Sequence, residues 1–60
     1  MMASSHIFIT ELLEDIETGR VIPLTSVKNI ESILKEFVDE YSDYDVMLKD
    51  LEEWNYVKLL

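Results

Sequence analysis

Residues 26–41, SVKNIESILKEFVDEY, carry the clearest pattern in this chain of 60 residues. Their apolar side chains recur at alternating steps of three and four, which places all of them along one stripe of an α-helix. The stripe consists of Val27, Ile30, Ile33, Leu34, Phe37, Val38 and Tyr41. Thr25 or Ser26 can cap the start of this helix. Because one amphipathic helix is not stable alone in water, the rest of the chain must cover the stripe.

Residues 6–24, which precede this helix, allow two interpretations. In the first, residues 7–10 (IFIT) and 20–24 (RVIPL) are the strands of a β-hairpin. Asp15 would accept hydrogen bonds from the backbone of the turn between them, and Gly19 would take a positive φ. Pro23 would lie on an edge or near a strand end, because proline has no N–H to donate.

In the second interpretation the same segment is a helix. Its apolar residues with helical spacing are Ile9, Leu12, Leu13 and Ile16. Thr10 would cap the start of that helix, and Gly19 would cap its end. Acidic residues 14, 15 and 17 argue against it, because they would crowd the negative end of the helix dipole. The sequence therefore favours the hairpin.

The C-terminal third predicts a short helix and a strand. Residues 42–45 (SDYD) end the main helix, and Asp45 can cap a second helix over residues 46–54. Its apolar side consists of Met47, Leu48, Leu51 and Trp54. Asn55 can end this helix in a left-handed conformation. Residues 56–60 (YVKLL) alternate between apolar and polar at first and predict a closing strand.

We therefore predict an α+β fold in a single small domain over residues 6–60, preceded by a flexible leader over residues 1–5. The domain would contain the β-hairpin, the main amphipathic helix, the short second helix and the C-terminal strand, with the sheet laid over the stripe of the main helix. A three-helix bundle is the alternative.

Size and composition limit how this domain can be stabilised. There is no cysteine and only one histidine, His6, so disulfides and sites of Cys or His ligands for zinc are excluded. Small domains without such links often associate, and we expect a homodimer. No apolar run is long enough to span a membrane, and no signal peptide is visible, so we expect a cytoplasmic protein without membrane contact.

No motif predicts an enzyme, a cofactor or a metal site. Catalysis needs a positioned base, nucleophile or metal, and no spacing singles out such a set. Asp43 and Asp45 resemble the opening of a calcium-binding loop. The sixth and twelfth positions of that loop should be Gly and Glu, but Leu48 and Trp54 stand there instead.

The acidic residues are distributed unevenly. The net charge is −8, and residues 36–53 contain eight acids against one base, Lys49, which gives that segment −7. This charge opposes direct binding to nucleic acid and favours a basic protein partner. Aromatic residues adjoin the acids, as they do at many protein interfaces. We predict a partner-binding site that consists of Glu36, Asp39, Glu40, Tyr41, Asp43, Tyr44, Asp45, Asp50, Glu52, Glu53 and Trp54.

In size, charge and aromatic content the chain resembles the small inhibitors that bacteriophages make against host enzymes or defence systems, including protein mimics of DNA. This resemblance implies an anti-defence or inhibitor function that occupies a basic, nucleic-acid-binding surface. The alternative is a structural module that acts by homo-oligomerisation. Its contact surface would be the helix stripe together with Ile7, Ile9, Val57 and Leu59.

Overall fold

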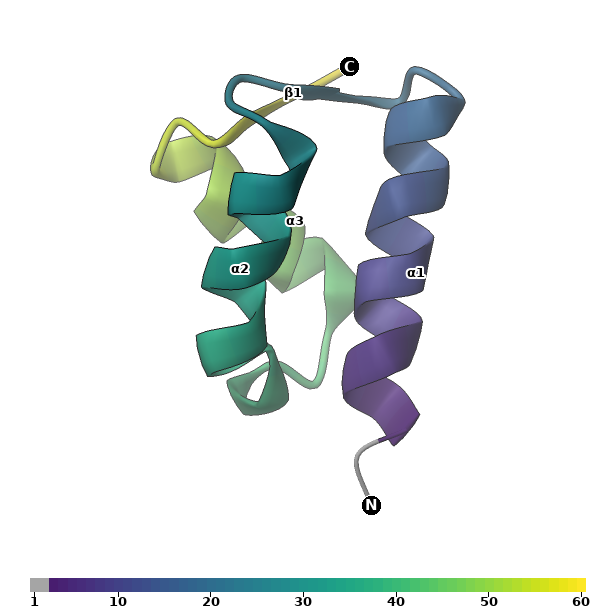
Figure 1. Cartoon of the computed structure of the whole chain (residues 1–60), viewed down its shortest axis with the longest axis vertical. Coiled ribbons are helices and arrows are strands. Elements are labelled where there is room, and N and C mark those ends of the chain that lie inside the picture. The colour runs from purple at the N-terminus through teal and green to yellow at the C-terminus, as the bar shows by residue number, and fades with distance from the viewer. Residues whose placement is uncertain (1–2) are drawn as a thin grey trace.

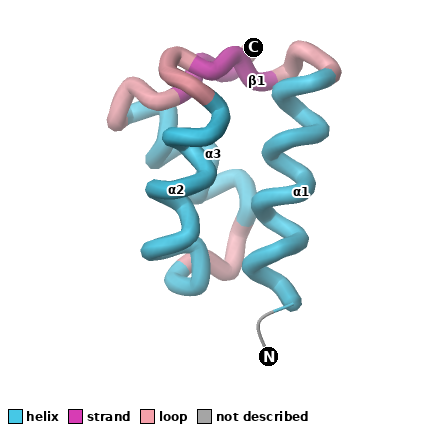
Figure 2. Tube along the Cα trace, viewed as in Figure 1, coloured by secondary structure: helices cyan, strands magenta, loops and turns pink. Residues whose placement is uncertain are grey.

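Three helices stand side by side, and a small sheet crosses one end of them (Figure 1). This computed structural model describes the backbone of residues 3–60 and the side chains of residues 7–60. The elements are α1 (Ala3–Glu17), β1 (Val21–Pro23), α2 (Val27–Phe37), the 3₁₀-helix η1 (Val38–Glu40), α3 (Tyr44–Glu53) and β2 (Val57–Leu59). Figure 2 shows how short the strands are beside the helices. The predicted α+β fold class is confirmed.

The main helix forms as its periodicity predicts. The hydroxyl of Ser26 accepts a hydrogen bond from the backbone N–H of Asn29 at 3.1 Å, so Ser26 is the N-cap. The regular α-helix ends at Phe37, and residues 38–40 continue as the tighter η1. Such 3₁₀ turns are common where the last carbonyls of a helix lack partners. The stripe therefore reaches Tyr41 through two kinds of helix.

The core is built mainly by the helices. Its fully buried members are Leu12, Val21, Ile30, Leu34, Val38, Met47, Leu48, Leu51 and Val57. Three of these come from α2 and η1, three from α3, one from α1 and one from each strand. The expectation that a sheet would cover the helix stripe is thus wrong, because α1 and α3 supply most of the cover.

The prediction that residues 7–10 form the first strand of a hairpin is also wrong. Residues 7–10 lie inside α1, which begins at Ala3, within the expected leader. Met1, Met2 and the side chain of His6 lie outside the described residues. The helical spacing prevails because it buries Leu12 completely and packs Ile9 and Ile16 against the core. Burying such side chains outweighs a dipole penalty of about 0.3–1 kcal/mol for each exposed acid.

The turn after α1 does form at Gly19. Gly19 has φ +86°, its N–H donates to the carbonyl of Ile16 at 3.2 Å, and the N–H of Arg20 donates to the carbonyl of Asp15 at 2.9 Å. This pair of bonds is a Schellman motif, which suits glycine because it needs a left-handed residue. The motif leads the chain directly from α1 into β1.

The predicted left-handed residue Asn55 ends α3 in the same way. Asn55 has φ +66°, its N–H donates to Glu52, and the N–H of Tyr56 donates to Leu51 at 2.9 Å. The start of α3 differs from the expectation, because Asp43 and not Asp45 is the N-cap. The carboxylate of Asp43 accepts from the N–H of Asp45 at 2.9 Å.

The strands predicted over residues 20–24 and 56–60 form β1 and β2, but they pair with each other. The sheet is antiparallel, with Val21 opposite Leu59 and Ile22 opposite Lys58. Its outer edges are protected. Pro23 offers no N–H on the edge of β1, and Glu52 accepts from the N–H of Leu59 at 3.4 Å on the edge of β2.

Truncating the centre of this core tests the packing. Leu34 is 0% exposed, so we expect Leu34→Ala to lower the free energy of unfolding by about 2–5 kcal/mol. Val46→Ala is the control, because Val46 is 47% exposed on α3 and its change should stay within about 0.5 kcal/mol. Urea unfolding followed by circular dichroism measures both. Equal losses in the two variants would contradict this core.

Candidate protein-binding surface

An aromatic cluster links the last residue of α2 to the C-cap residue of α3. The ring of Phe37 contacts Tyr41 at a centroid distance of 5.9 Å and Trp54 at 5.4 Å, both edge to face. This geometry is the favoured one for aromatic pairs. Phe37 and Tyr41 are half-buried, whereas Trp54 is 47% exposed. The cluster therefore presents a large apolar ring to solvent on a packed base.

A hydrogen bond joins this cluster to a carboxylate. The hydroxyl of Tyr41 donates to Oδ2 of Asp50, which links the residue after η1 to the middle of α3. Burial, the bond to Asp50 and the negative charges of Asp50 and Glu40 together raise the pKa of Tyr41 to about 12. Tyr41 thus keeps its proton at neutral pH and holds Asp50 in position.

Helix geometry adds further acids beside the cluster. Glu53 and Trp54 lie three and four residues after Asp50, so each is a neighbour of Asp50 on α3. Glu36 lies four residues before Glu40, and the charge of Glu40, in η1, acts on Tyr41. We call the combined set the aromatic–acidic surface. Its members are Glu36, Phe37, Glu40, Tyr41, Asp50, Glu53 and Trp54.

The potential over this surface is negative for two reasons. The last turn of α3 contains no basic residue. The C-terminal end of a helix also carries partial negative charge from the helix dipole, and Trp54 is the C-cap of α3. The one base of α3, Lys49, lies about 140° around the helix from Trp54. A cation near Trp54 would therefore meet carboxylates and the negative end of the helix dipole together.

The structure divides the site that the sequence predicts. Asp39 and Asp45 are exposed on η1 and on the first turn of α3. Three others have structural roles: Asp43 caps α3, Glu52 protects β2, and Tyr44 turns toward α1. Only Glu36, Glu40, Tyr41, Asp50, Glu53 and Trp54 belong to the aromatic–acidic surface.

Tyr44 connects the start of α3 to α1. Its hydroxyl donates to Asp15 at 2.8 Å, and its ring lies 5.9 Å from that of Phe8. Burial, followed by the bond to Asp15 and the charges of nearby acids, raises the pKa of Tyr44 well above its ordinary value. Those acids include Glu11 of α1, so acidic residues of α1 gather beside the start of α3.

Sequence reasoning missed Phe37 as part of the surface and missed the acids of α1. Phe37 was assigned to the core stripe, although its spacing of four from Tyr41 is a signal that the two rings touch. The contact with Trp54 depends on how α2 and α3 pack, and no local pattern encodes it. The hairpin interpretation placed the acids of α1 in or near a turn, and so it did not place them beside the start of α3.

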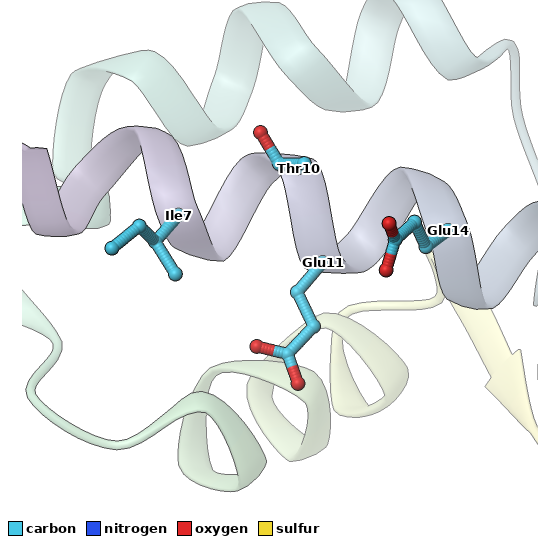
Figure 3. A pocket seen from close by; sticks show the side chains of 4 residues that line it. All are labelled: Ile7, Thr10, Glu11 and Glu14. Carbon is cyan, nitrogen blue, oxygen red and sulfur yellow. The ribbon is translucent and has the colours of Figure 1, made fainter.

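A pocket of about 350 Å³ lies along the outer side of α1 (Figure 3). Its lining includes Ile7, Thr10, Glu11 and Glu14 of α1, and Glu11 points toward α3. The pocket is open, and its polar lining consists of one hydroxyl and two carboxylates.

Among the described side chains, those of residues 7–60, no group of three or more His, Cys, Asp or Glu is arranged to hold a metal ion. No helix within residues 3–60 combines the length and the apolar character needed to cross a membrane. Comparisons with protein-family models, curated proteins and solved structures found no match to this chain. Function must therefore be argued from the surface itself.

The two tyrosine–aspartate hydrogen bonds should make the stability of the fold fall at alkaline pH. Since folding raises the pKa of Tyr41 and of Tyr44, their contribution to stability is complete below about pH 10 and falls above it, and the part from Tyr41 is lost as the pH rises through about 12. We expect urea unfolding to report a falling free energy over that range. A variant with Tyr41→Phe and Tyr44→Phe should be less stable at neutral pH and should lose less above about pH 10. An equally steep loss in that variant would contradict the assignment.

Proposed function

We propose that this protein is a small acidic protein-binding module that inhibits a host or defence protein by occupying its basic, nucleic-acid-binding surface. One observation carries the proposal. The half-exposed ring of Trp54 packs on Phe37 beside the carboxylate of Asp50, which Tyr41 holds in place. An exposed tryptophan on a packed base is the kind of residue that contributes most to binding energy at protein interfaces.

The charge of the chain supports a basic partner. At −8, the protein attracts cationic surfaces over several ångströms and repels nucleic acid. Exposed acids occur on α1, η1 and α3, so charge alone does not single out one face. The aromatic cluster singles out one face, because it places exposed apolar area beside the acids, and covering apolar area with a partner is favourable. Acids elsewhere would steer the partner and add to a field like that of a phosphate backbone.

Two pairs of charge reversals test this proposal. Glu36→Lys with Glu53→Lys alters the aromatic–acidic surface, and Glu14→Lys with Glu17→Lys makes the same change in net charge on exposed positions of α1. Immobilised parent and variants would be used to capture proteins from host lysate at low salt. We expect the first pair to reduce capture by at least about tenfold and the second by less than about threefold.

The same capture tests mimicry of DNA. Proteins held by the parent should bind nucleic acid themselves, and an excess of duplex DNA should release them. Capture that survives duplex DNA would contradict the inhibitor function. Equal effects of the two pairs of reversals would contradict the aromatic–acidic surface as the binding site.

A second candidate function is assembly with another copy of the chain. The apolar surface that the sequence indicated for this role is wrong in part. Ile30, Leu34 and Val38 of the helix stripe are buried in the core together with Val57, and Ile9 and Leu59 pack against it. The outer face of the sheet favours assembly instead. Ile22, Leu24 and Leu60 are 39%, 53% and 84% exposed.

These three residues lie on one face of an extended ladder. The N–H of Leu24 donates to Tyr56 at 2.8 Å, and the N–H of Leu60 donates to Arg20 at 3.2 Å, so pairing continues by one step beyond each end of the strands. Side chains alternate along such a ladder, and Val21 on the opposite face is buried. The exposed apolar residues therefore share one face with Lys58, opposite Ile22, and Arg20, opposite Leu60, and a second copy would cover the apolar patch on that face.

If the chain assembles through this patch, Leu24→Ser with Leu60→Ser should convert a dimer into a monomer. Sedimentation at roughly 10–100 μM protein measures the change, a range chosen for affinities in the micromolar class. Val46→Ser is the control, because Val46 is an exposed apolar residue on α3. A parent chain that sediments as a monomer over this range would contradict the assembly function.

A further inference from the structure

We infer that the aromatic–acidic surface selects arginine over lysine in its partner, with a guanidinium group stacked on Trp54 and paired with the carboxylate of Asp50. This inference rests on the proposed function, since it names the side chain by which a basic partner would be recognised. Three features of the surface lead to it, and each distinguishes a planar cation from a compact one.

The first feature is the ring of Trp54. It is 47% exposed, and its contact with Phe37 at 5.4 Å and an interplanar angle of 74° fixes its tilt. The face of an indole ring carries negative potential and attracts cations. A guanidinium group is planar and stacks on that face over its whole area, whereas an ammonium group touches it at one point.

The second feature is the position of Asp50. It lies four residues before Trp54, and its carbonyl accepts from the N–H of Trp54 at 3.0 Å, so the two side chains are neighbours on one side of α3. The bond from Tyr41 orients the carboxylate before any partner arrives. An arginine side chain has five N–H donors in a fixed plane, so it can pair with this carboxylate while it stacks on the ring.

The third feature is that the residues around Trp54 are partly shielded from solvent. Phe37, Tyr41 and Asp50 are all half-buried, and contact with a partner would remove more water from them. Guanidinium is more weakly hydrated than ammonium, so it loses less on entering such a site. Glu53, exposed three residues after Asp50, supplies a second carboxylate to balance the charge.

Two peptides test the inference, one of about ten arginines and one of about ten lysines, which differ in the cation but not in charge. Titration calorimetry at low salt measures both affinities. We expect the arginine peptide to bind the parent about five- to tenfold more tightly. Trp54→Leu should bring the two affinities to within about twofold of each other, mainly by weakening the binding of the arginine peptide. Tyr56→Leu removes another half-buried aromatic residue and should leave the preference intact.

Asp50→Asn gives a second, independent variant. Asparagine keeps an acceptor for the hydroxyl of Tyr41 but removes the charge, so the preference should fall while circular dichroism stays that of the parent. Equal affinities of the parent for the two peptides would overturn the inference and leave the proposed function standing. A preference that survives Trp54→Leu would overturn it as well. Failure of both peptides to bind the parent would overturn the inference together with the proposed function.

Discussion

The constraint on which this structure depends is the burial of the apolar stripe of α2 in a chain without disulfides. Leu34 at the centre of the stripe is fully enclosed, and buried residues of α1, α3 and both strands surround it. Because no cross-link helps, packing and capping have to stabilise the fold. The same fold puts the ring of Phe37, at the end of α2, against the ring of Trp54, the C-cap of α3. The candidate binding surface is thus a consequence of how the core closes.

Two similar helix–strand units complete the enclosure. In each, a left-handed residue ends the helix in a Schellman motif, and the chain enters a strand two residues later: Gly19 leads to Val21, and Asn55 leads to Val57. Both valines are buried, so each turn is fixed by the hydrophobic residue that follows it. The second turn also determines where Trp54 lies, since the helix stops at this residue and leaves its ring half exposed.

Local signals in the sequence were sufficient for much of this fold. The period of residues 26–41, the cap at Ser26, the left-handed Asn55 and the two strand segments all appear as predicted. The interpretation of residues 7–10 as a strand failed because the β propensity of these residues is a local signal, whereas the burial of Leu12 in the core depends on tertiary packing. The acids that argued against α1 are accommodated, and one of them, Asp15, accepts a hydrogen bond from Tyr44.

The candidate site was predictable only in part, and for a related reason. Composition identifies the acids and aromatics of residues 36–53, but not which of them face solvent together. Asp43, Tyr44 and Glu52 are occupied by a cap, an interhelical bond and a strand edge, and each of these roles depends on a neighbour distant in space or on an exact helix start. What separates a binding face from an ordinary acidic exterior is the tertiary contact between Phe37 and Trp54.

We infer that the half-exposed ring of Trp54 lies in a concentrated negative field. Trp54 is the only tryptophan of the chain, so quenching of its fluorescence tests the claim without any partner. Caesium and iodide would be compared at constant ionic strength, each relative to a free tryptophan derivative. We expect caesium to quench the fluorescence of Trp54 at least about twofold more strongly than iodide does, each relative to that reference. This difference in quenching should shrink as added salt screens the field. Equal relative quenching by the two ions, or stronger quenching by iodide, would contradict this inference.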